Sequence, residues 1–178
     1  NDIKEIDDWI KEAEEVGELA VDTETSSLDP HQADLIGISL SSKISKACYI
    51  PINHNTEKNI NKDLVLKKLK PLLEDPSIKK IGQNIKFDFI VLLKQGIKLT
   101  SMEDTMLMSY VLDAGKNRHN MDTLSEIHLG HKTIAFKDLV GTGKKEINFS
   151  EVNLEKAKNY AAEDADITYR LYKKFYKS

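Results

Sequence analysis

The sequence contains one cysteine, no long apolar run and no excess of charge of either sign. Cys48 alone cannot form a disulfide within the chain, so a secreted scaffold held by internal disulfides is excluded. No apolar run approaches the ~18 residues that a membrane span needs, and the first residues do not read as a basic-then-apolar leader. With 26 basic and 29 acidic residues, the net charge of −3 gives no general attraction to nucleic acid. These absences lead us to expect a soluble, cytoplasmic protein in a reducing compartment, without a membrane partner.

The composition that remains is ordinary for a globular protein. Hydrophobic residues make up 40% of the 178 positions and charged residues 31%, so the chain can bury a core. Neither repeats nor a low-complexity linker divides it, and we expect a single domain over residues 1–178. Because the chain starts with Asn1 rather than Met, we expect this domain to be a segment of a longer protein.

Hydrophobic periodicity predicts an α/β domain with a mixed sheet. Strands are predicted at residues 19–25, 35–40, 47–50 and 79–82, the first three as an antiparallel meander. Helices are predicted at residues 3–16, 62–73, 85–95, 105–112 and 121–129, followed by a long helix capped by Ser150 or Asn153 and ending at Tyr176. Residues 130–150, with their glycines and lysines, are predicted to form an exposed, mobile excursion, and Cys48 to be buried in its strand.

The first candidate site is the end of the strand at residues 19–25. Because strand side chains alternate, Asp22 and Glu24 share one face, while Leu19, Val21 and Thr23 point to the other. Burying two neighbouring carboxylates costs several kcal/mol unless they are paired or bind a cation. The alternative is a strand that simply ends here, with both acids in solvent.

The second candidate site is the junction Gly82-Gln83-Asn84, where a predicted strand runs into the helix at 85–95. A helix N-terminus offers free backbone N–H groups and a positive dipole end, which predicts a phosphate-binding position. Asn84 and Asp88 are four residues apart and share a helix face. The alternative is structural, with Asn84 as the N-cap and Asp88 as a first-turn acid favoured by the dipole.

The third candidate site lies on the final helix, in Tyr160-Ala161-Ala162-Glu163-Asp164. Tyr160 and Asp164 again form an i, i+4 pair, and the small alanines between them allow another element to approach closely. Asp166 is predicted to point elsewhere, into solvent. An ordinary helix with a surface acid and a half-buried tyrosine is the alternative.

The three sites together indicate a metal centre. Four carboxylates, from Asp22, Glu24, Asp88 and Asp164, would be neutralised by two divalent cations. Oxygen ligands suit Mg²⁺ or Mn²⁺, and the chain has no Cys/His spacing for zinc. Two such ions can activate a water and stabilise the leaving oxygen in phosphodiester hydrolysis, and the Tyr160 hydroxyl could orient that water.

The motifs Asp22-x-Glu24, Asn84-x-Lys86-Phe87-Asp88 and Tyr160-x-x-x-Asp164 resemble those of the DEDD exonuclease superfamily, tyrosine subtype. The sequence is most similar to the 3′–5′ proofreading exonuclease domains of bacterial family A DNA polymerases, the DNA polymerase I family. Further support comes from the segments 131–136, 141–144 and 160–166, and the resemblance runs from about residue 18 to 177. It implies a ribonuclease H-like mixed sheet flanked by helices.

The resemblance also implies residue roles. Asp22, Glu24, Asp88 and Asp164 would bind two Mg²⁺ ions, with Mn²⁺ as a substitute, and Tyr160 with Glu24 would position the attacking water. These five are the expected catalytic residues.

Further residues are expected to bind the substrate. Leu28 and Phe136 match apolar side chains that pack against the terminal bases, and Gln83, Asn84 and Arg118 are candidates for phosphate and sugar contacts. Phe87 departs from the pattern, because the best-known relative has tyrosine there, and a contact made by that hydroxyl would be missing.

The expected activity is metal-dependent 3′–5′ hydrolysis of single-stranded or frayed DNA to nucleoside 5′-monophosphates. The expected partners are a DNA 3′ end and a polymerase module on the same longer chain, in a monomer associated with the bacterial nucleoid. One alternative is a ribonuclease D-like exonuclease that trims RNA 3′ ends with the same five residues. Another is a non-catalytic domain that supports a polymerase.

Overall fold

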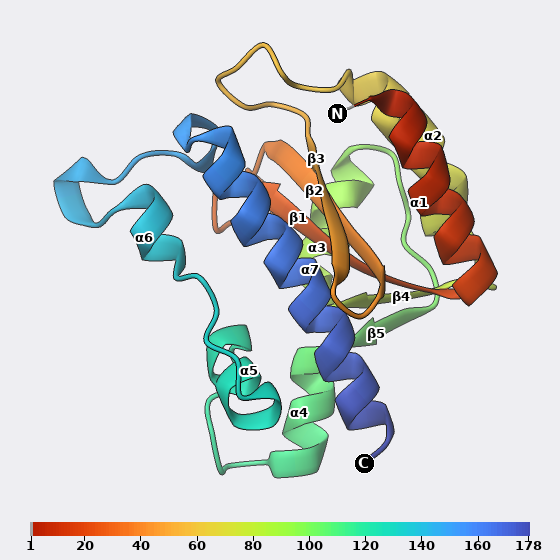
Figure 1. Ribbon diagram of the computed structural model, residues 1–178, viewed down its shortest axis with the longest axis vertical. Coiled ribbons are helices and arrows are strands. Elements are labelled where there is room, and N and C mark those ends of the chain that lie inside the picture. The colour runs from red at the N-terminus through yellow and green to blue at the C-terminus, as the bar shows by residue number, and fades with distance from the viewer. Residues whose placement is uncertain (1) are drawn as a thin grey trace.

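One five-stranded mixed sheet organises the computed structural model, which describes residues 2–178 (Figure 1). The strands are β1 (Glu18–Thr25), β2 (Leu35–Lys43), β3 (Lys46–Pro51), β4 (Lys79–Gly82) and β5 (Met102–Asp104). They lie in the order β3-β2-β1-β4-β5. The first three pair antiparallel, whereas β4 pairs parallel with β1 and β5 parallel with β4. The predicted meander and mixed sheet are therefore confirmed.

Helices cover both faces of this sheet. They are α1 (Ile3–Val16), α2 (Lys62–Glu74), α3 (Ile85–Lys94), α4 (Thr105–Asp113), α5 (Met121–Leu129), α6 (Phe136–Val140) and α7 (Leu154–Tyr176), with the short 3₁₀ turns η1 (Gly143–Lys145) and η2 (Phe149–Glu151). Figure 1 shows the long α7 crossing in front of the sheet and α3 behind it. None of the described helices combines the length and the apolarity that crossing a bilayer requires.

The alternation along β1 decides which side chains face which helices. Leu19 and Val21 belong to the main apolar core, with residues of α1, α2 and α3. Ala20 packs on the opposite side, against Tyr169 and Tyr172 of α7. Since Asp22 and Glu24 share the side of Ala20, the strand directs both carboxylates toward α7.

A buried row of alanines lets α7 lie close to the sheet. Ala157, Ala161 and Ala165 occur at intervals of four residues and are all 0% exposed. The helix begins after Asn153, whose side chain accepts hydrogen bonds from two backbone N–H groups of the first turn. These features fix the register at which Asp164 meets the strand.

The structure corrects four sequence-based predictions. The sequence did not predict β5, which has only three residues. Residues 130–150 are not a structureless excursion, because they contain α6, η1 and η2, and Val140 and Phe149 are each only 3% exposed. Asp166 is not solvated: its carboxylate accepts a hydrogen bond from the Ser45 backbone and forms an ion pair with Arg170. Cys48 is only partly buried in β3.

Candidate metal and nucleic-acid site

Three of the four predicted metal-binding carboxylates converge where β1 meets α7. One oxygen each from Asp22, Glu24 and Asp164 lies within 4.8 Å of the other two. Glu24 and Asp164 are buried, with exposures of 8% and 5%, and Asp22 is partly buried. Strand and helix thus bring together acids that are more than a hundred positions apart in the sequence.

Asp88 approaches the same strand from α3. Its Oδ1 atom accepts hydrogen bonds from the Thr23 backbone N–H at 2.9 Å and from the Thr23 hydroxyl at 2.5 Å. Thr23 stands between Asp22 and Glu24, so it holds the fourth carboxylate against the segment that carries the first two. The structure therefore places Asp88 beside the group of three, 3% exposed and already bonded through one oxygen.

Burial, and for three of the four carboxylates a neighbouring negative charge, disfavours their ionised form. Burial raises the pKa of Asp22 to about 6. Burial, followed by the negative charges of Asp22 and Asp164, raises the pKa of Glu24 well above its usual range. Burial and the charge of Asp22 raise the pKa values of Asp88 and Asp164 in the same way.

The donor set fits a divalent cation. Glu24 Oε1 is buried and has no hydrogen-bond partner among the described residues. An unpaired buried carboxylate oxygen is costly, and here it lies in a group of acids whose charges repel. Carboxylate oxygens are the ligands of Mg²⁺ and Mn²⁺, so Asp22, Glu24, Asp164 and the adjoining Asp88 could hold such ions.

Tyr160 lies one helical turn before Asp164 and borders the acids. Its ring is 5.6 Å from the Phe136 ring and 6.1 Å from the Phe149 ring, measured between centroids. Burial, with a smaller effect from the charge of Asp164, raises the pKa of its hydroxyl. The hydroxyl therefore stays protonated at neutral pH, and it can donate a hydrogen bond.

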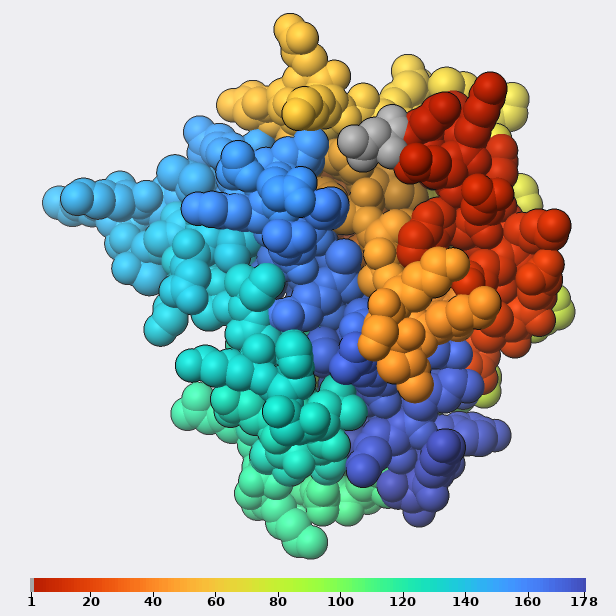
Figure 2. Space-filling view, viewed as in Figure 1, coloured from red at the N-terminus to blue at the C-terminus, as the bar shows by residue number. Residues whose placement is uncertain are grey.

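A hollow of about 450 Å³ opens beside the acids. Its lining includes Glu24, Tyr160, Leu28 and Phe136, together with Phe87. Leu28 is 95% exposed and Phe136 41% exposed, so both offer apolar surface to a ligand. In Figure 2 the segment that carries α6 and η1 projects from the body next to the first half of α7. The two residues predicted to contact bases thus line the same hollow as two of the predicted catalytic residues.

The backbone N–H groups at the start of α3, predicted to be free for phosphate, already have an acceptor within the protein. The backbone N–H groups of Asn84 and Ile85 already donate to the carboxylate of Asp104, at 2.8 and 3.2 Å. The side chain of Asn84 is exposed and does not cap the helix, and its backbone has a left-handed φ of 57°. Asn84 therefore occupies the N-cap position and Asp88 the first turn, as the structural alternative has it, but the carboxylate of Asp104 rather than the Asn84 side chain accepts from the free N–H groups.

The other two predicted phosphate or sugar contacts differ in their surroundings. Gln83 is engaged within the protein, since its amide donates to the His119 carbonyl and accepts from the Thr105 hydroxyl. Arg118 is exposed, next to the residue that Gln83 contacts. Of these two residues, Arg118 is therefore the more available to a ligand.

Asp104 is a structural residue that the sequence reasoning missed. Its carboxylate also accepts from the Met106 N–H at 2.9 Å, so it caps α4 while it binds the turn before α3. An aspartate immediately before a predicted helix is an N-cap signal that could have marked it.

Replacing Asp104 by alanine is expected to lower the free energy of unfolding by about 2–4 kcal/mol, because three backbone N–H groups lose their acceptor. Chemical denaturation of the purified chain measures this. The matched control is Glu103→Ala, whose side chain is 41% exposed, with an expected change within about 0.5 kcal/mol. Equal effects from the two variants would show that the Asp104 contacts do not stabilise the fold.

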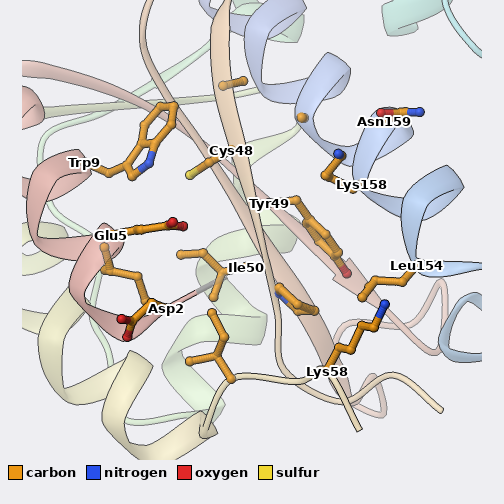
Figure 3. Close-up of a pocket in the computed structure, with 15 residues that line it drawn as sticks. Asp2, Glu5, Trp9, Cys48, Tyr49, Ile50, Lys58, Leu154, Lys158 and Asn159 are labelled. Carbon is orange, nitrogen blue, oxygen red and sulfur yellow. The ribbon is translucent and has the colours of Figure 1, made fainter. Parts of the chain in front are cut away.

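A second hollow of about 420 Å³ lies between α1, β3 and α7 (Figure 3). Figure 3 shows Trp9 of α1, Cys48 and Tyr49 of β3 and Lys158 of α7 around it. None of the predicted site residues lines it, and the converging carboxylates are absent from its walls. Of these two hollows, the one beside Glu24 is therefore the one that predicted site residues line.

Comparison with known proteins shows the family of the chain. A family model described as 3′–5′ exonuclease matches residues 1–178. The chain is 43% identical to DNA polymerase I of Rhizobium leguminosarum over 192 residues and 45% identical to that of Pseudomonas aeruginosa over 172 residues. These matches cover 96% and 93% of the chain, which spans only 19% of each relative.

Solved structures with similar folds include nucleases. Brucella melitensis NrnC with bound Mg²⁺ superposes with a TM-score of 0.70 at 25% identity, covering 93% of this chain and 74% of NrnC. Escherichia coli RNase D has a TM-score of 0.64 at 19% identity, covering 96% of this chain and 44% of RNase D. At that identity RNase D shows the fold alone, which confirms the ribonuclease H-like prediction.

Proposed function

Because this chain belongs to the 3′–5′ exonuclease family found in DNA polymerase I, we propose that it removes nucleotides one at a time from single-stranded or frayed DNA 3′ ends. The products would be nucleoside 5′-monophosphates. The observation that carries the proposal is the convergence of Asp22, Glu24 and Asp164 within 4.8 Å, beside a hollow with an apolar lining.

We assign the metal-binding role to Asp22, Glu24, Asp88 and Asp164. Two bound divalent ions would supply an activated water and stabilisation of the departing 3′ oxygen. Thr23 holds Asp88 in place through two hydrogen bonds. The protonated Tyr160 hydroxyl, together with Glu24, would position the attacking water. Burial of these groups reduces solvent screening, which strengthens their interaction with cations.

The hollow suits a single strand rather than a duplex. Leu28 and Phe136 can pack against bases without reading their identity, as aromatic and apolar surfaces do in sequence-tolerant binding. A mispaired terminus unpairs at lower cost than a matched one, so it would reach the acids more often. Selectivity for errors would then come from the melting of the primer end.

Chromatography of the products tests this function. With Mg²⁺ and single-stranded DNA, we expect nucleoside 5′-monophosphates to accumulate, and a chelator to stop their release. Release of oligonucleotides or of 3′-monophosphates would contradict the proposal, as would release that continues unchanged in chelator.

Leu28 and Phe136 form the exposed apolar rim of the hollow. Truncating either side chain is expected to weaken DNA binding rather than slow the hydrolysis step. Leu28→Ala and Phe136→Ala should each lower the affinity for single-stranded DNA about fivefold or more, since each removes a base contact worth ~1–3 kcal/mol. Fluorescence anisotropy measures the affinity, and calorimetry with Mn²⁺ should give the same metal affinity as the unaltered chain. Leu64→Ala, on α2 and 51% exposed, is the matched control and should bind DNA normally. Unchanged DNA affinity in both rim variants would remove them from the substrate site.

RNA is the alternative substrate. NrnC, at 25% identity, has been solved bound to pGG, so a related fold accepts a short oligonucleotide. The greater identity of 43–45% to proteins named DNA polymerase I favours DNA. A supporting domain without activity is disfavoured, because all four acids are present.

The polymerase module is the proposed partner, as the chain spans about a fifth of its DNA polymerase I relatives. We propose that residues 1–178 form one exonuclease domain within such a protein. An exposed apolar stripe on α4, formed by Leu107, Tyr110 and Val111, supports contact with another protein surface. In Figure 2 α4 lies at the same end of the molecule as the end of α7.

A further inference from the structure

Phe136 stands at the end of a segment that has little structure of its own. Residues 130–135 connect α5 to α6 without helix or strand, and none of them is buried. Apolar burial therefore does not hold this segment in place. The Phe136 ring itself packs against the rings of Phe149 and Tyr160, at 6.1 and 5.6 Å between centroids, and the segment that leads to it depends on polar contacts.

Glu163 of α7 binds this segment at two points. Its Oε1 atom accepts a hydrogen bond from the Ile134 backbone N–H at 2.7 Å. Its Oε2 atom lies 3.2 Å from Nε2 of His131. The Glu163 side chain is 19% exposed, so the two contacts are partly shielded from water.

The segment has further ties, but these lead to α5. The Thr133 hydroxyl donates to Asp122, and the Ser125 hydroxyl donates to the His131 carbonyl. Within the described residues 2–178, the hydrogen bonds of residues 131–135 reach the helix that carries Tyr160 and Asp164 only through Glu163. Glu163 therefore supplies the polar link between residues 131–134 and α7, beside the ring contact between Phe136 and Tyr160.

Glu163 and Asp164 are neighbours in sequence, but their side chains contact different parts of the protein. Successive helix residues are turned by about 100°, so one carboxylate can face β1 while the next faces residues 131–134. Glu163 does not belong to the group of oxygens that converge with Asp22.

We infer that Glu163 is a positioning residue for the substrate: it fastens residues 131–134 to α7 and thereby places Phe136 against the base of the terminal nucleotide. This inference rests on the proposed function, because it assumes that the hollow binds a strand end. Glu163 acts through Phe136, and its carboxylate is not among the oxygens that converge with Asp22.

The test is a double-mutant cycle between Glu163 and Phe136, measured on single-stranded DNA. Glu163→Ala should raise KM about fivefold, as loss of one base contact does, with kcat within about twofold. Adding Glu163→Ala to Phe136→Ala should change KM by less than about twofold, because Phe136 is the group through which Glu163 acts. Glu163→Gln should recover most of the effect, since its amide oxygen still accepts from Ile134.

Two controls separate this role from general damage to α7. Glu155→Ala removes another acid of the same helix, one paired only with Lys158 at the surface, and should leave KM unchanged. His131→Ala removes one of the two anchors without altering α7 and should raise KM by a smaller factor. It provides the test if Glu163→Ala does not fold.

The outcomes distinguish this inference from the proposed function. Equilibrium binding of DNA with 2-aminopurine at its 3′ end reports stacking without hydrolysis, and Glu163→Ala should reduce the quenching as Phe136→Ala does. If the chain hydrolyses nothing but shows this behaviour, the proposed function fails and the positioning role stands. Independent effects that multiply in the double variant would overturn the inference, and so would loss of Mn²⁺ binding in Glu163→Ala.

Discussion

Asp164→Ala and Asp22→Ala are each expected to reduce nucleotide release from single-stranded DNA by about a thousandfold or more. Each substitution removes an oxygen from the group that converges within 4.8 Å. The remaining carboxylates could not hold a pair of divalent ions in the geometry that hydrolysis needs. Initial rates with Mg²⁺ measure the effect, and circular dichroism confirms that each variant is folded.

The control for this loss is an acid of α7 that lies outside the cluster. Glu155→Ala should retain the rate of the unaltered chain, because Glu155 is exposed and pairs only with Lys158. Calorimetric titration with Mn²⁺ should show weakened binding in Asp22→Ala and Asp164→Ala but not in the control. Full activity in either cluster variant would remove that residue from the catalytic site.

The metal-free chain is expected to lose stability as the pH rises from 6.5 to 8. Asp22, Glu24, Asp88 and Asp164 have folded-state pKa values above those of unfolded carboxylic acids, so the folded protein retains protons that the unfolded chain has released. The free energy of unfolding then falls by about 1.4 kcal/mol per pH unit for each retained proton. The loss of stability begins near pH 4, the pKa of a carboxylic acid in the unfolded chain, and ends above the pKa values of the four acids in the folded protein.

Thermal unfolding in chelator and in Mn²⁺ measures this dependence. Mn²⁺ should raise Tm more at pH 8 than at pH 6.5, because ions that bind only the folded state relieve the repulsion between ionised acids. The pKa of His54 is lowered by burial, which stabilises the fold as the pH rises toward about 6.5, so measurements start there.

Variants isolate the contribution of the cluster. In chelator at pH 8, Asp22→Ala and Asp164→Ala should be no less stable than the unaltered chain and should show a flatter pH dependence. A large drop in Tm for either variant would contradict the expected destabilisation by the buried acids. Stability that rises with pH between 6.5 and 8 would contradict their raised pKa values.

The core of the site could be predicted from sequence because its spacing is local. Asp22 and Glu24 lie on one face of a strand, and Tyr160 and Asp164 on one face of a helix, so a short pattern marks each half of the site. The resemblance to the exonuclease family is what joined the two halves. The predicted bounds of the longer elements also agree with the structure because their spacing is local. The hydrophobic periodicity of strands (two residues) and of helices (3.6 residues) is a property of residues close together in sequence. The family resemblance and its fold are also confirmed.

The remaining features depend on contacts between distant residues. Asp104 occupies the N–H groups at the start of α3 from 20 positions further along the chain, which no local pattern indicates. Asp166 accepts from Ser45, 121 positions away, and so is not solvated. Phe149 lies among glycines and lysines but packs with Ile36 and Ala157, which removes it from solvent. Polarity of the neighbours is a poor guide where tertiary packing decides burial.

The most direct test of the central claim is digestion of 5′-labelled single-stranded DNA and of the matched RNA, with Mg²⁺, with Mn²⁺ and with chelator. We predict a metal-dependent ladder that shortens from the 3′ end of the DNA, with slower digestion of RNA. Faster digestion of RNA would assign the chain an RNA substrate. Label released first as a mononucleotide, or intact DNA with folded protein in either metal, would contradict the assignment of this site as a 3′–5′ exonuclease centre.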